Sequence, residues 1–255
     1  MEFHRPKSLE EAVELLKQPS SVVVAGGTAF SGKPQAEQLV DLTALNLSYV
    51  DEKEDGFHIG ATTTISELEK STVAEMAGGF LRQACSLLAD TPLRNMITVG
   101  GNIACRHVWA HLPPVLMVLD SKVLISGKKE REANIEDVVS NGLGQGEFIR
   151  EVIIPKKRGR GVFKKFALTR TDYAAVIVAV YSDESELRIA VGGLAQPFRL
   201  KELEKSGNGG RVNPEQIGKA VDRINPVFHP TLSADHRKEV LKVLLKRALQ
   251  EVGKI

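Results

Sequence analysis

VVVAGGTAFSGK (residues 22–33) joins a run of valines to a Gly-Gly turn and then to polar residues. Glycine adopts backbone conformations that other residues resist, and it lets a ligand approach the main chain closely. A strand that ends in such a turn can present several backbone N–H groups to a phosphate. An ordinary tight turn is the alternative, because Gly-Gly turns are frequent.

A second Gly-Gly pair, Gly100-Gly101, ends the strand-like run TPLRNMITVGGNIA (91–104). Thr28, Thr98 and Asn102 flank the two pairs. Backbone N–H groups of both turns could hold one polyphosphate from two sides, with the Thr and Asn side chains adding neutral hydrogen bonds. From these residues alone, a pair of phosphate-binding loops and two structural turns both remain open.

The composition is typical of a soluble globular protein. The 255 residues are enough for one large or two medium domains, and 42% are hydrophobic. The 34 basic residues nearly balance the 32 acidic ones, which gives no electrostatic case for nucleic-acid binding. The basic cluster KKRGRGVFKK (156–165) is either a solvated loop or a docking surface for an acidic partner.

The sequence predicts a cytoplasmic protein without membrane contact. The first residues, MEFHRPKSLEEAVELL, lack the apolar core of a signal peptide, and no apolar run reaches the ~20 residues that cross a bilayer. Cys85 and Cys105 are the only cysteines and form no CxxC pair, so nothing indicates a disulfide scaffold.

Hydrophobic spacing indicates helices and strands that alternate over the first ninety residues. Ser8 to Glu11 reads as a capping box before a helix, and the two prolines of LPPVLMVLD (112–120) suit the first turn of another. Strands are predicted in SKVLISGKK, EFIREVIIP and, after residue 162, in FKKFALTRTDYAAVIVAVYS and ELRIAVGG. From about residue 213 the pattern is helical. The basic stretch near 156–162 is the natural domain boundary.

Several short motifs do not amount to a catalytic or metal site. GLGQG (142–146) lacks the third glycine of a dinucleotide fingerprint, because Glu147 occupies that position, and a strand follows it. Cys105, His107 and His111 do not have zinc spacing. We therefore predict no catalytic residues and no metal ligands of the protein's own, and a bound cofactor that does the chemistry.

Six segments in order carry a resemblance to a known family: AGGTAF (25–30), LRNMITVGGNIA (93–104), LPPVLMVLD (112–120), GEFIREVIIP (146–155), KFALTRTDYAAVIVAV (165–180) and SADHRKEVLKVLLKRAL (233–249). The chain resembles the flavin-binding subunit of molybdenum hydroxylases, such as the medium chain of carbon monoxide dehydrogenase and the FAD domain of xanthine dehydrogenase.

The resemblance implies an α+β fold. Residues 1–157 would form a two-subdomain FAD-binding domain of the molybdenum hydroxylase or PCMH type, with α/β subdomains at about 1–55 and 56–157. Residues 158–255 would form a smaller C-terminal domain, a three-stranded antiparallel sheet with helices.

The resemblance also implies which residues hold FAD. Residues 24–30 would lie along the pyrophosphate, and a second set beginning at Thr98 would contact it from the other Gly-Gly segment. The main chain of one residue and the ammonium of another would meet the flavin end. These residues are Val24, Ala25, Gly26, Gly27, Thr28, Ala29, Phe30, Thr98, Gly100, Gly101, Asn102, Cys105, His111, Ile149 and Lys165.

Three positions depart from the family pattern. Cys105 stands where Thr is usual, Ala110-His111 where Ser-Asp is usual, and Ala29 where a polar residue is often found. The carboxylate that commonly holds a ribose hydroxyl is therefore missing, and His111 would take its place. A scaffold protein of the same fold that has lost flavin is one alternative, and a stand-alone flavin reductase is another.

The family implies an electron-transfer role. Electrons would pass from a molybdopterin-binding large subunit, through two-iron two-sulfur clusters on a small subunit, to FAD in this chain and then to NAD or another acceptor. The chain has too few cysteines for a cluster of its own, since each cluster needs about four thiolates. It should be inactive towards the substrate without these partners.

Overall fold

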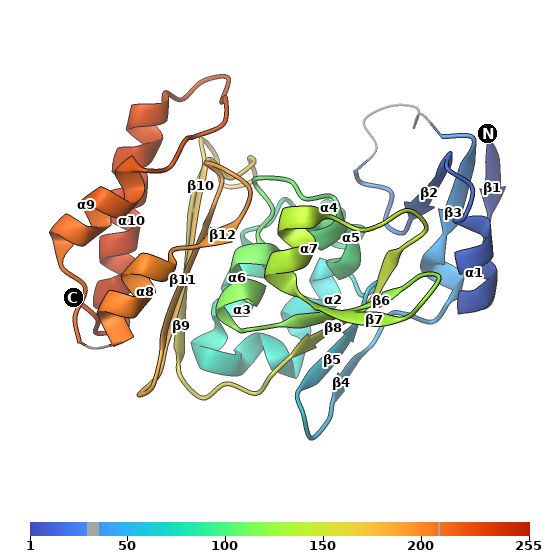
Figure 1. Cartoon of the computed structure of the whole chain (residues 1–255), viewed down its shortest axis with the longest axis horizontal. Coiled ribbons are helices and arrows are strands. Elements are labelled where there is room, and N and C mark those ends of the chain that lie inside the picture. The colour runs from blue at the N-terminus through green and yellow to red at the C-terminus, as the bar shows by residue number, and fades with distance from the viewer. Residues whose placement is uncertain (30–35, 209) are drawn as a thin grey trace.

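The computed structural model describes residues 1–29, 36–208 and 210–255, and within them the chain forms three sheets that follow one another along the long axis of the molecule (Figure 1). No helix in these residues is long and apolar enough to cross a membrane.

The N-terminal sheet is parallel, in the order β1-β3-β2, with β1 at Glu2–His4, β2 at Ser21–Val24 and β3 at Gln38–Asp41. The predicted cap of the first helix is present: α1 (Leu9–Leu15) begins after Ser8, whose hydroxyl accepts a hydrogen bond from the Glu11 N–H. Ala12 of α1 and Val40 of β3 share a small core. A short 3-10 helix, η1 (Leu42–Ala44), follows β3.

The middle sheet is antiparallel, in the order β4-β5-β8-β6-β7. Its strands are β4 (Val50–Glu52), β5 (Phe57–Gly60), β6 (Lys122–Ser126), β7 (Arg131–Asn134) and β8 (Phe148–Ile154). The helices of this layer are α2 (Ile65–Lys70), η2 (Thr72–Glu75), α3 (Met76–Ser86), α4 (Thr91–Arg94), α5 (Val99–Ala104), α6 (Leu112–Val118) and α7 (Ile135–Asn141).

The C-terminal sheet is antiparallel, as expected. It contains β9 (Arg160–Phe166), β10 (Val176–Ser182) and β11 (Leu187–Gly192), and a two-residue strand, β12 (Phe198–Arg199), is added at the β11 edge. Helices α8 (Lys201–Asn208), α9 (Pro214–Asp222) and α10 (Ala234–Glu251) lie on its outer side, and α3 and α6 lie on its inner side (Figure 1).

This sheet is covered on both faces, which explains the unbroken apolar sequence of β10. Side chains alternate along a strand, so Ile177 and Ala179 enter the core of the middle layer, whereas Val178 and Val180 enter the core beneath α8, α9 and α10. All seven residues of β10 are buried. The C-terminal sheet therefore packs directly against the middle layer.

The strand-like interpretation of TPLRNMITVGGNIA is wrong, because this segment forms α4 and α5. Asp90 caps α4 by accepting a hydrogen bond from the Leu93 N–H, and Thr98 caps α5 by accepting one from the Gly101 N–H. The second Gly-Gly pair thus lies in the first turn of a helix.

Two glycine substitutions should change stability in opposite directions. Gly218 lies within α9 with no atom close to its added Cβ, so Gly218→Ala should raise the free energy of unfolding by about 0.5–1 kcal/mol. Gly79 has a φ of +76°, so Gly79→Ala should lower it by about 1–2 kcal/mol. Urea denaturation of both variants checks this, and a shift of the same sign in both would contradict it.

Candidate cofactor site

The first Gly-Gly turn follows β2 directly. At Gly26 an added Cβ would collide with the backbone carbonyl of Met96, so the backbones of the two segments touch there. Gly27 has a φ of +68° and nothing near its added Cβ, and it is exposed together with Thr28 and Ala29. The turn therefore packs through its first glycine and opens to solvent at its second.

The backbone of this turn offers hydrogen-bond donors. Among the described residues, none accepts a hydrogen bond from the backbone N–H groups of residues 25–29. Phe30, also expected in the site, lies outside the described residues. Successive backbone N–H groups in a turn that reaches the surface are a donor set that phosphate oxygens bind.

The second Gly-Gly pair has the same division of roles. At Gly100 an added Cβ would lie 2.7 Å from the Cβ of Ala61, so this glycine allows α5 to pack closely on the segment after β5. At Gly101 an added Cβ would approach only the hydroxyl of Thr98, its own cap, at 2.9 Å. The first glycine again packs inward, and the second leaves the surface open.

At the start of α5, the backbone N–H groups are already hydrogen-bonded within the protein. The N–H groups of Val99, Gly100 and Gly101 donate to the Thr63 carbonyl, the Ala61 carbonyl and the Thr98 hydroxyl. Asn102 extends from the next position, and its Oδ1 accepts a hydrogen bond from the Leu112 N–H at 3.2 Å. Backbone donors for a ligand would thus come from residues 25–29 rather than from the start of α5.

His111 is buried. Its Nδ1 donates a hydrogen bond to the Ala84 carbonyl oxygen at 3.0 Å, and its ring packs against Phe163 with ring centroids 5.4 Å apart. Burial lowers the pKa of His111 to about 4, so the ring is neutral near pH 7. With Nδ1 engaged, Nε2 is the ring nitrogen left for the ribose contact, which stays a prediction.

The other three residues predicted to contact the cofactor are Cys105, Ile149 and Lys165. Cys105 is the half-buried C-cap of α5, and burial raises the pKa of its thiol. The Ile149 side chain is buried in the middle core, which leaves only its main chain for a ligand. Lys165 of β9 donates to the carbonyl oxygens of Leu87 and Arg170, both at 3.0 Å, and burial lowers its pKa.

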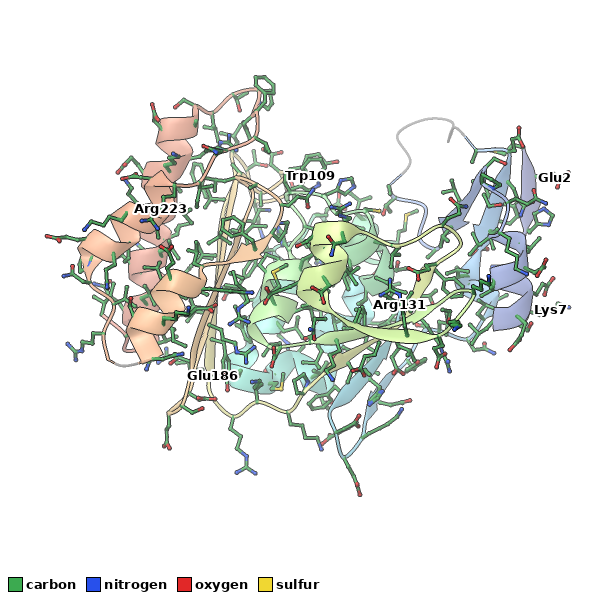
Figure 2. All side chains as sticks on the ribbon, in the orientation of Figure 1. Glu2, Lys7, Trp109, Arg131, Glu186 and Arg223 are labelled. Carbon is green, nitrogen blue, oxygen red and sulfur yellow. The ribbon has the colours of Figure 1, made fainter. Side chains whose placement is uncertain are left out.

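An aromatic cluster beside these residues was not predicted as part of the site. Trp109 stacks on His107, with ring centroids 4.6 Å apart, and makes a tilted contact with Tyr173, with centroids 4.7 Å apart. Tyr173 is 73% exposed, and Figure 2 shows Trp109 at the upper edge of the molecule, between the C-terminal sheet and the middle layer. The contact joins two segments far apart in sequence. The only sequence signal was the single tryptophan next to the second Gly-Gly segment.

The geometry fits a dinucleotide cofactor bearing phosphates. The first Gly-Gly turn, whose backbone N–H groups donate to no described residue, touches the second segment where Gly26 meets the Met96 backbone. No group of three or more His, Cys, Asp or Glu side chains among the described residues is arranged to hold a metal ion.

Two protein families, one after the other, together match nearly the whole chain. The family described as the FAD binding domain in molybdopterin dehydrogenase matches residues 1–157. The family described as the CO dehydrogenase flavoprotein C-terminal domain matches residues 161–252.

Individual relatives match over their full length. The glyceraldehyde dehydrogenase medium chain of Sulfolobus acidocaldarius is 27% identical, with 98% of each chain covered. The carbon monoxide dehydrogenase medium chain of Hydrogenophaga pseudoflava is also 27% identical, over 97% of this chain and 95% of its own. In fold, a chain of the reconstituted CO dehydrogenase from Oligotropha carboxidovorans matches with a TM-score of 0.90 and 24% identity, over 100% of this chain and 98% of that one.

Proposed function

The chain belongs to the family of FAD-binding medium subunits of the molybdenum hydroxylases, and we propose that it carries electrons from the iron–sulfur clusters of a small partner subunit to NAD. Membership in this family makes the chain an oxidoreductase subunit with an FAD-binding domain. In the proposed complex, a molybdopterin-binding large subunit oxidises the substrate. Bound FAD would supply the chemistry that accepts electrons singly and releases them as a pair.

One observation carries the proposal: the backbone N–H groups of residues 25–29 donate to none of the described residues, and their turn touches the Met96 backbone just before α5. In our proposal, the backbone of residues 24–30 donates to the FAD pyrophosphate, and Thr98 and Asn102 line the opposite wall with Gly100 and Gly101. No carboxylate is among these residues, so none repels the phosphates.

The flavin end would lie towards the C-terminal domain. Lys165 is held there by two carbonyl oxygens, and its ammonium would favour negative charge on a nearby flavin ring. Cys105, His111 and the main chain of Ile149 would complete the site. We place the domain boundary at residues 157–158, with the two subdomains of the FAD-binding domain meeting near residue 55.

The purified chain should take up FAD, and NADH should bleach the flavin absorbance without any partner. A purine or aldehyde substrate should leave the absorbance unchanged, because the hydroxylating site would be on another chain. Absorbance spectra after anaerobic addition of each compound measure this. Failure to take up FAD would favour the scaffold alternative. Bleaching by substrate alone would contradict the proposed division of labour, and FAD uptake without bleaching by NADH would indicate another electron acceptor.

A further inference from the structure

The loop GLGQG (142–146) and the first residue of β8 connect the middle layer to the N-terminal layer. The Gln145 side-chain amide donates to the carbonyl oxygens of Leu16 and Gln18, at 3.4 and 3.3 Å. These carbonyls lie just beyond the end of α1, where helical carbonyl groups lack partners within the helix. The loop therefore caps a helix of the neighbouring layer.

Gly146 brings the two backbones together. Its φ is +75°, and an added Cβ would lie 3.2 Å from the Leu16 carbonyl oxygen. Side chains at such a φ are strained, and this one would also push against the end of α1. Gly146 thus permits the close approach of two protein backbones, whereas the glycines of a dinucleotide-binding motif permit the close approach of a ligand.

Phe148 inserts into the N-terminal core. Its side chain is 2% exposed and packs with Ala12 and Leu16 of the α1 segment and with Val40 of β3. The next residue, Ile149, already belongs to the core of the middle layer. One strand therefore begins in one core and continues in the other.

The rest of the loop is fixed to the middle layer. Glu147 accepts two hydrogen bonds from Arg131 of β7, at 2.9 and 2.7 Å, and one from the Gly144 N–H at 2.8 Å. Figure 2 shows Arg131 on the side of the middle layer nearest the N-terminal layer. Residues 145–148 are thus anchored to the middle layer and inserted into the N-terminal layer.

These contacts bear on the cofactor because the two layers carry opposite walls of the site. Residues 25–29 extend from β2 in the N-terminal layer, and α5 belongs to the middle layer. Where the walls touch, at Gly26 and Met96, there is no space for even a methyl group. A shift of one layer against the other would change the spacing between the free N–H groups and α5.

We propose that Gln145, Gly146 and Phe148 are positioning residues that set the distance between the two walls of the FAD site, although none of them lies in either wall. The proposal rests on FAD lying between the two Gly-Gly segments. A small misplacement of binding groups is costly, since contacts to a rigid ligand are lost together.

The test compares Phe148→Leu with Phe80→Leu. Both side chains are 2% exposed, and both changes are chemically identical. Phe80, however, lies in α3 and packs near Gly161 of β9, on the side of the C-terminal sheet rather than at the boundary between the N-terminal and middle layers. FAD titration at low temperature gives the dissociation constant, and urea denaturation gives the stability of each apo-protein. Phe148→Leu should weaken FAD binding about tenfold, which corresponds to about 1.4 kcal/mol, and Phe80→Leu should change it less than about twofold.

Gln145→Ala is the second variant, because it leaves both cores intact and should fold. It should weaken FAD binding about threefold with little loss of stability. Equal FAD affinity in Phe148→Leu, Phe80→Leu and the wild type would overturn the inference, as would equal weakening in both Phe variants. A wild-type chain that takes up no FAD would instead overturn the proposed function.

Discussion

Gly27→Val is expected to lower the affinity for FAD by at least about 100-fold while the chain stays folded, a loss of about 2.7 kcal/mol. Among the residues that the structure describes, no atom lies within 4 Å of the added Cβ. It would fill the space in front of the free N–H groups, where the pyrophosphate is proposed to lie. Gly101→Val should also weaken FAD binding, from the α5 side, although its added Cβ would lie 2.9 Å from the Thr98 hydroxyl. FAD titration of the apo-proteins measures both.

Gly253→Val is the matched control for backbone strain. Gly253 has a φ of +73° and also has open space around its added Cβ, but it follows α10 in the C-terminal domain. The backbone cost of about 1–2 kcal/mol should therefore be shared by Gly27→Val and Gly253→Val. Only Gly27→Val should lose FAD. Full FAD affinity in Gly27→Val would place the cofactor elsewhere.

Elements with strong local signals could be predicted from the sequence. The cap at Ser8 and the prolines at the start of α6 mark helix ends through the residues themselves. The strands β10 and β11 follow from apolar runs separated by the acidic turn at residues 183–185, whereas β9 ends at Phe166 and is not continuous with β10. Such signals depend on neighbours in sequence, so they survive without knowledge of the rest of the fold.

The conformation of the second Gly-Gly segment could not be predicted in this way. Ile97, Thr98 and Val99 are β-branched, and two glycines follow, which is a poor helical sequence. The helix forms because the Val99 N–H donates to Thr63 and the Gly100 N–H donates to Ala61, both more than thirty residues away. Tertiary hydrogen bonds therefore override the local preference.

The candidate site was predictable only in outline. Both Gly-Gly pairs stand out in the sequence, but which glycine of each pair packs inward depends on the Met96 backbone and on Ala61. Likewise, the burial of His111 depends on Ala84 in α3 and Phe163 in β9. A pattern can identify a segment as cofactor-binding, whereas the packing partners decide what each side chain in it can reach.

The free energy of unfolding of the wild-type protein is expected to fall between pH 7 and pH 4.5 by about 2–3 kcal/mol more than that of His111→Asn. The cause is the buried imidazole of His111. Burial lowers the pKa of His111 to about 4 in the folded protein, below the value near 6.5 of an unfolded chain. Between these values the unfolded state binds more protons, so stability falls as pH falls. The contribution is complete above about pH 6.5 and is lost as the pH approaches the folded pKa of about 4.

His111→Asn isolates this effect, since the Asn amide can still donate a hydrogen bond to the Ala84 carbonyl oxygen but does not titrate. His107 and His229, whose pKa values burial also lowers, are present in both proteins and cancel in the difference. Urea denaturation of the apo-proteins at pH 7, 6, 5 and 4.5 gives that difference at each pH. His111→Asn should lose some packing against Phe163, so the wild type should be the more stable protein at pH 7 and should lose that advantage on acidification. A constant difference across this range would contradict the prediction. It would mean that His111, although enclosed by α3 and β9, is protonated as readily in the folded chain as in the unfolded one.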